Sequence, residues 1–110
     1  MVVIADKFIS VTRGNTLLAS VSMKDKETGD TIQPSPGDIV RFAVKKFYTN
    51  SDILIYKIIP NDTMILELEP DDTKDLPFGD YVFDIKIIYA DGKEDTFITE
   101  GEFVVAKGVD

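Results

Sequence analysis

The chain has 110 residues, 44% of them hydrophobic, and a formal net charge of −8 at neutral pH. It contains no cysteine, histidine or tryptophan, which excludes disulfide bonds, thiolate metal sites and histidine as a catalytic base. The excess of acid opposes binding to nucleic acid and to an anionic membrane surface. Length and composition together predict one folded domain over residues 1–110.

The N-terminal segment MVVIADK carries no targeting signal that we can identify. It has no basic region before its apolar residues, and its apolar run is too short for a signal-peptide core. No apolar run elsewhere approaches the length of a transmembrane helix. We therefore expect no signal peptide, no membrane partner, and a chain that is cytosolic at synthesis or exported by a route that the sequence does not record.

Apolar and polar residues alternate along most of the chain, with the period of two that is typical of half-buried β-strands. Val40, Phe42 and Val44, for example, share one face, and Arg41 and Lys45 share the other. The same alternation predicts eight strands, at residues 7–12, 15–24, 38–46, 52–59, 63–69, 80–90, 93–98 and 102–106.

Turn residues separate these predicted strands. Asp91-Gly92 is a strong hairpin signal between 80–90 and 93–98, and Gly101 predicts a bulge or kink before the last strand. Residues 71–76 suit one helical turn, which Pro77 ends. The pattern predicts an all-β fold, an immunoglobulin-like antiparallel β-sandwich of about seven to eight strands.

A short turn before residues 80–90 predicts a structural corner. In immunoglobulin-type sandwiches, a tyrosine at the start of strand F directs its hydroxyl back to the preceding loop backbone. Gly79 and Tyr81 stand in that relation to Phe83, which takes an inward-facing position two residues later. We therefore predict that Tyr81 is a structural residue and has no catalytic role.

Acidic residues gather in the loop that precedes this corner. Calcium binds several loop carboxylates and carbonyls, so Asp71, Asp72, Asp75 and Asp80 are the candidate ligands for a calcium site. The alternative is that Asp71 or Asp72 caps the short helical turn and that the other carboxylates are solvated. The spacing of an EF-hand is absent, and we expect no metal and no cofactor.

Three aromatic residues form a set, in which Phe47 and Tyr48 lie at a strand end beside a polar loop and Tyr56 lies in the predicted strand 52–59. Exposed aromatic side chains anchor many protein interfaces, which makes this set a candidate protein contact. The alternative is that these rings close the end of the core. The sequence leaves both interpretations open.

Catalytic patterns are missing from the sequence. Without histidine, a serine or threonine nucleophile needs a lysine or carboxylate base, and no Ser-x-x-Lys motif occurs. No phosphate-binding loop or dinucleotide fingerprint occurs either. Paired carboxylates for glycoside hydrolysis require a cleft that a sandwich of this size rarely has. We therefore expect no enzyme activity and no catalytic or cofactor-binding residues.

Four stretches of the chain have a characteristic order of features, namely ISVTRGNTLLASVSMKDKETGD, PGDIVRFAVKK, IPNDTMILELEPDDTKDLPFGDYVFDIKI and YADGKEDTFITEGEFVV. This order resembles that of small immunoglobulin-like sandwich proteins of tailed phages and prophages of Gram-positive bacteria. The N-terminal domain of phage baseplate upper proteins is one such relative. Baseplate upper proteins continue into a long helical region, whereas this chain stops at Asp110, so the resemblance implies a free-standing sandwich.

The resemblance implies a non-enzymatic structural or adaptor protein of a tail or baseplate. Its partners would be other phage structural proteins or further copies of itself, with assembly through faces or edge strands into a ring. We expect residues 7–12 and 102–106 to be the sheet edges, with 102–106 open to strand addition. Two alternatives remain, a carbohydrate- or surface-binding module and a soluble phage-encoded regulator of a host protein.

Overall fold

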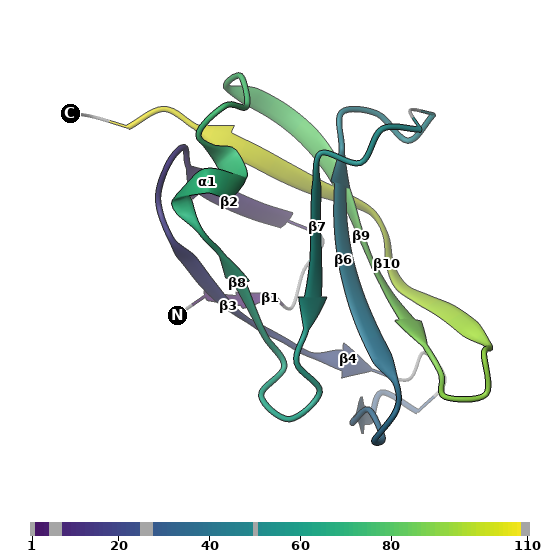
Figure 1. Ribbon diagram of the computed structural model, residues 1–110. Coiled ribbons are helices and arrows are strands. Elements are labelled where there is room, and N and C mark those ends of the chain that lie inside the picture. The colour runs from purple at the N-terminus through teal and green to yellow at the C-terminus, as the bar shows by residue number, and fades with distance from the viewer. Residues whose placement is uncertain (1, 5–7, 25–27, 50, 109–110) are drawn as a thin grey trace.

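Two β-sheets packed face to face form the domain, with the hydrophobic core between them (Figure 1). This structure, a computed structural model, describes residues 2–4, 8–24, 28–49 and 51–108, with the side chains of 2–4 and 98–100 outside the description. Lys7, the first residue of the predicted strand 7–12, therefore lies outside the described residues, as do parts of two predicted loops.

The described residues form ten strands and one short helix. No described helix is long and apolar enough to cross a membrane. In chain order the elements are β1 (Val2–Ile4), β2 (Phe8–Thr12), β3 (Leu17–Val21), β4 (Met23–Lys24), β5 (Thr31–Ile32), β6 (Ile39–Lys45), β7 (Ile55–Ile59), β8 (Ile65–Leu68), α1 (Pro70–Thr73), β9 (Gly79–Ile88) and β10 (Glu94–Ala106).

The strand order confirms the predicted sandwich. The larger sheet has the order β2-β10-β9-β6-β7, the smaller has β1-β3-β8, and β4 and β5 form a separate pair. The run β10-β9-β6-β7 corresponds to strands G, F, C and C′ of an immunoglobulin-type sheet, and β3 and β8 correspond to B and E. The chain changes sheets between β1 and β2, between β2 and β3, between β3 and β6 by way of the β4–β5 pair, between β7 and β8, and again before β9.

Two strand pairs are parallel, whereas the other pairs between the described strands are antiparallel, as expected for an antiparallel sandwich. β1 runs parallel to β3, and β2 runs parallel to β10. A parallel pair requires a long connection between its strands, and nearly the whole domain lies between β2 and β10. The alternation of apolar residues reports which face a strand buries, but it does not report the direction of the neighbouring strand.

The C-terminal part of the sheet differs from the prediction in two respects. The predicted strands 93–98 and 102–106 are one strand, β10, whose register shifts between Ile98 and Gly101, so Gly101 marks an irregularity as predicted. Residues 102–106 are not an edge, because β2 pairs with them on one side and β9 on the other. The edges of the larger sheet are β2 and β7.

Other boundaries shift by a few residues. The predicted strand 15–24 is divided into β3 and β4, although Leu17, Ala19, Val21 and Met23 are all buried as predicted. Helix α1 begins at Pro70, ahead of the predicted turn, because proline is well suited to the first helical position. The Asp91-Gly92 hairpin joins β9 to β10 as predicted.

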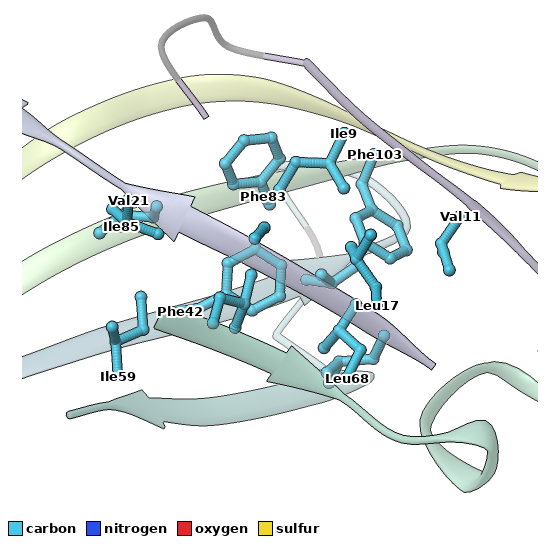
Figure 2. Packing of buried hydrophobic residues seen from close by; sticks show 14 of the residues in the cluster. Ile9, Val11, Leu17, Val21, Phe42, Ile59, Leu68, Phe83, Ile85 and Phe103 are labelled. Carbon is cyan, nitrogen blue, oxygen red and sulfur yellow. The ribbon is translucent and has the colours of Figure 1, made fainter. Parts of the chain in front are cut away.

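Three phenylalanine rings form the centre of the core, on the inner face of the larger sheet (Figure 2). The ring of Phe42 lies 5.5 Å from that of Phe83 and 6.1 Å from that of Phe103, between ring centroids. Leu17 and Leu68 of the smaller sheet belong to the same buried cluster. Such aromatic contacts add stability beyond the area that the rings bury.

Gly101 leaves the space that the Phe83 ring occupies. A Cβ atom on residue 101 would lie 2.5 Å from Cε1 of Phe83, which is closer than van der Waals contact allows. We therefore expect Gly101→Ala to lower the free energy of unfolding by about 1–3 kcal/mol, because a ring in a packed core must move. Urea unfolding of the purified variant measures this loss.

The matched control for Gly101→Ala is a double-mutant cycle with Phe83→Leu. The smaller side chain removes the clash, so the two substitutions together should cost less than the sum of their separate costs. Additive costs would contradict the steric explanation.

Candidate functional site

The corner predicted at Tyr81 is present at the start of β9. The Tyr81 side chain is 3% exposed, and its hydroxyl donates a 2.6 Å hydrogen bond to the carbonyl oxygen of Pro77. Gly79 has φ +141°, a conformation that side-chain-bearing residues rarely adopt, so glycine permits the turn. β9 is an interior strand of the larger sheet. The corner therefore fixes where β9 enters the sheet.

Lys46 braces this corner from the end of β6, a contact for which the sequence holds no local signal. Its ammonium donates a 2.9 Å hydrogen bond to the backbone carbonyl of Asp80 and lies 4.6 Å from the centre of the Tyr81 ring. The same ammonium lies 5.8 Å from the ring centre of Phe47. Lys46 thereby contacts both the exposed Phe47 ring and the start of β9.

The four candidate calcium ligands are not brought together. Asp72 accepts a 2.7 Å hydrogen bond from the backbone N–H of Glu69 and pairs with Lys57 at 2.9 Å, and it caps α1 as the alternative interpretation proposed. Asp71 pairs with Lys74, and Asp80 is the second residue of β9, beyond the loop that holds Asp75. Within the described residues, no group of three or more acidic side chains is placed to hold a metal ion.

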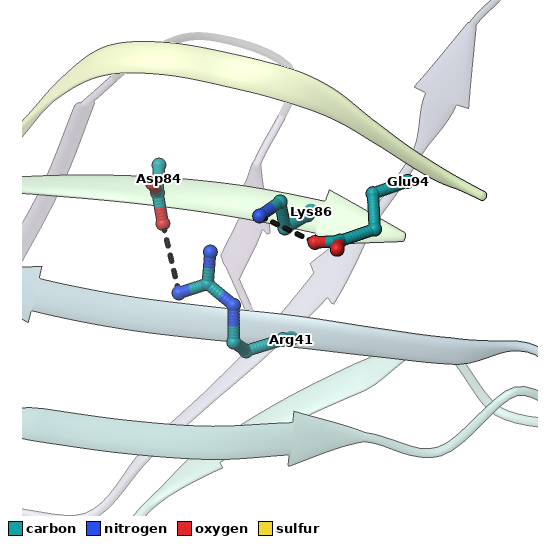
Figure 3. A network of polar contacts seen from close by, with 4 residues as sticks. All are labelled: Arg41, Asp84, Lys86 and Glu94. Atoms are coloured by element: carbon teal, nitrogen blue, oxygen red, sulfur yellow. Dashed lines mark ion pairs between the residues drawn. The ribbon is translucent and has the colours of Figure 1, made fainter. Parts of the chain in front are cut away.

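The outward side of the larger sheet, called the outer face below, has charged pairs at its centre (Figure 3). Arg41 of β6 pairs with Asp84 of β9 at 3.1 Å, and Lys86 of β9 pairs with Glu94 of β10 at 2.6 Å. The hydrogen bond from Lys86, and then its charge, lower the pKa of Glu94 below its ordinary value. Oδ1 of Asp84 is buried and accepts no hydrogen bond from the described residues, so its contact with Arg41 is purely an ion pair.

Two members of the aromatic set lie beside the Arg41–Asp84 pair, because the ring centre of Tyr56 is 5.9 Å from the guanidinium carbon of Arg41 and Tyr48 lines a pocket with Asp84. The side chains of Phe47, Tyr48 and Tyr56 are 59%, 51% and 51% exposed, so they do not close the end of the core. Ile58, on the same strand as Tyr56, is also exposed. The register places Tyr56 opposite Ala43 and Ile58 opposite Arg41. Tyr56 and Ile58 therefore lie on the outer face, as Arg41 does. We call Phe47, Tyr48, Tyr56 and Ile58 the aromatic patch.

A groove crosses the other part of the outer face, and sequence analysis did not find it. Its volume is about 340 Å³. The register joins its strands in one row, in which Phe8 of β2 is opposite Glu102 of β10, and Glu102 is opposite Val82 of β9. The groove is lined by Phe8, Lys46, Phe47, Asp80, Val82, Glu102 and Val104, with Tyr81 beneath. We call it the Phe8–Phe47 groove.

These residues come from β2, the end of β6, β9 and β10, segments that are far apart in the sequence. Comparison with protein-family models, with curated proteins and with solved structures finds no match for this chain. The argument for function therefore depends on the surface itself. What the outer face offers chemically is a combination of exposed aromatic rings, paired charges and a groove, which suits binding.

The corner predicts an alkaline loss of stability. Burial raises the pKa of Tyr81 above its ordinary value near 10. Above that pH the unfolded chain releases the tyrosine proton first, so the free energy of unfolding falls as pH rises. We expect Tyr81→Phe to cost about 1 kcal/mol at neutral pH, through the lost hydrogen bond, and to flatten the decline above pH ~10. Urea unfolding at a series of pH values measures both effects.

The control variant for this test is Tyr56→Phe, which removes a hydroxyl from a half-exposed ring. Its stability should stay near that of the unmodified chain at neutral pH. An alkaline decline of equal slope in Tyr81→Phe and in the unmodified chain would contradict the linkage.

Because the four candidate carboxylates are not brought together, we expect calcium to leave the stability of the domain unchanged. Asp72 is engaged by Lys57 and by the Glu69 N–H, and binding a cation there would break both contacts. We expect millimolar calcium chloride to leave the thermal unfolding midpoint unchanged, because a ligand raises stability only by binding the folded state. A rise in the midpoint that a chelator reverses, and that Asp72→Asn abolishes, would show that the site exists.

Proposed function

We propose that this chain is a non-enzymatic structural or adaptor domain that works by protein contact through the outer face of its larger sheet. The observation that carries the proposal is the aromatic patch, in which Phe47, Tyr48 and Tyr56 are each more than half exposed. Large aromatic side chains exposed at a surface are typical of interface anchors. Tyrosine and phenylalanine also lose little conformational entropy on binding.

The charged pairs beside the patch support the same proposal. Arg41–Asp84 and Lys86–Glu94 already neutralise each other, so a partner can cover them without leaving a single buried charge. Tyr56 lies beside Arg41, whose guanidinium carbon is 5.9 Å from the ring centre. The aromatic patch therefore lies beside charged side chains that are already paired with each other.

The particle in which we place the domain is that of a tailed phage or prophage, in the tail or baseplate. The order of sequence features supports this placement, and so does the Gly-x-Tyr corner of an immunoglobulin-like sandwich. Its partners would be neighbouring structural proteins or further copies of the chain, arranged with cyclic symmetry. It would be found in the virion or, before assembly, in the bacterial cytoplasm.

Mass spectrometry of purified particles, collected after prophage induction in the encoding bacterium, tests the placement. We expect the chain at a fixed copy number relative to the major tail proteins, since a ring component has the stoichiometry of its symmetry. A photo-crosslinking residue in place of Tyr56 should form adducts with a particle protein. The same residue in place of Leu18, exposed on the smaller sheet, is the matched control.

Absence of the chain from clean particles, together with its presence in the cell lysate, would overturn the structural assignment. In that case a Tyr56 adduct with a host protein would favour the alternative of a phage-encoded regulator. Equal adducts from positions 56 and 18 would overturn the assignment of the contact to the outer face.

A further inference from the structure

The Phe8–Phe47 groove has a shape suited to one side chain from a partner. Phe8 and Phe47 are 53% and 59% exposed. Three strand spacings separate β2 from β6, so the backbones of these two strands run about 14 Å apart across the sheet. Val82 and Val104 are partly buried between them. At about 340 Å³ the groove reaches the size range of specific ligand sites.

The floor of the groove alternates apolar and acidic side chains. The register sets Glu102 opposite Val82 and Val104 opposite Asp80, so each cross-strand pair joins a valine to a carboxylate. Neither carboxylate is in an ion pair with any of the described residues. The ammonium of Lys46 already donates to the carbonyl oxygen of Asp80 and faces the Tyr81 ring.

Phe8 and Glu102 stand directly opposite each other on adjacent strands, which puts an exposed aromatic ring beside a carboxylate. This juxtaposition suits the arginine side chain, whose guanidinium stacks on aromatic rings and pairs with carboxylates. The methylene groups of an arginine would lie along Val82 and Val104. A lysine makes a weaker match, because its compact ammonium neither stacks nor pairs bidentately.

We propose that the Phe8–Phe47 groove binds an arginine side chain presented by an extended segment of a partner protein. The net charge of −8 favours a basic partner over a second copy of this chain, which would bring two acidic surfaces together. The inference rests on the proposed function as a protein-contact domain and names the chemistry that the outer face would recognise.

The test uses the whole chain, labelled with ¹⁵N, and a synthetic acetylated peptide of sequence GSVTRVTSG, titrated to millimolar concentration. We expect saturable amide shifts at Phe8, Val82, Glu102 and Val104. The same peptide with citrulline in place of arginine keeps the shape and loses the charge. It should bind at least about tenfold more weakly, because a charge-assisted contact is lost.

Two variants assign the contact to the groove. Glu102→Gln and Phe8→Leu should each weaken arginine-peptide binding several-fold, and thermal unfolding checks that both remain folded. The matched control is Glu67→Gln, which removes the same charge from an exposed position on β8 and should bind as the unmodified chain does.

Equal binding of the arginine and citrulline peptides would overturn the proposal, as would equal binding by Glu102→Gln and the unmodified chain. Absence of amide shifts at millimolar peptide would overturn the proposal as well. Dimerisation of the chain that displaces the peptide would also overturn it. These outcomes are separate from the particle test. If the chain is found in particles at a fixed copy number but does not bind the arginine peptide, the proposed function stands and this inference is wrong.

Discussion

The packing of Phe42, Phe83 and Phe103 against one another is the constraint on which the rest of this domain depends. These rings come from three neighbouring strands and fill the inner face of the larger sheet, with ring centroids 5.5 and 6.1 Å apart for the two pairs that involve Phe42. Phe83 finds its place because residue 101 has no side chain. The position of β9 follows from this packing, and both the corner at Tyr81 and the outer face follow from the position of β9.

The inner and outer faces of the strands were predictable because alternation is a local property. Val40, Phe42 and Val44 are buried as the sequence indicates, and the hydroxyl of Tyr81 reaches the Pro77 carbonyl that the corner requires. What alternation cannot supply is the identity of a strand's neighbours, since these lie far away in the sequence. For that reason the sequence predicts an edge at residues 102–106, although β2 pairs with them.

The candidate sites divide in the same way. The exposure of Phe47, Tyr48 and Tyr56 agrees with one of the two interpretations that the sequence allowed. The sequence does not predict the Phe8–Phe47 groove, because its lining residues come from four segments that lie far apart in the chain. Lys46 was also missed, since the contact that matters is with a carbonyl group of β9 and no side-chain pattern records it.

The pairing of β2 with β10 has a consequence for how the chain is made. Phe8 lies opposite Glu102, so β2, which is synthesised early, has to wait for β10, which is synthesised much later. During translation β2 is an unpaired segment, and the larger sheet gains that edge only after β10 has left the ribosome. Long-range pairing of this kind slows folding and exposes apolar segments to wrong partners in the interval. The larger sheet therefore closes at β2 only once β10 is available, and the rate of that step sets how long β2 stays unpaired.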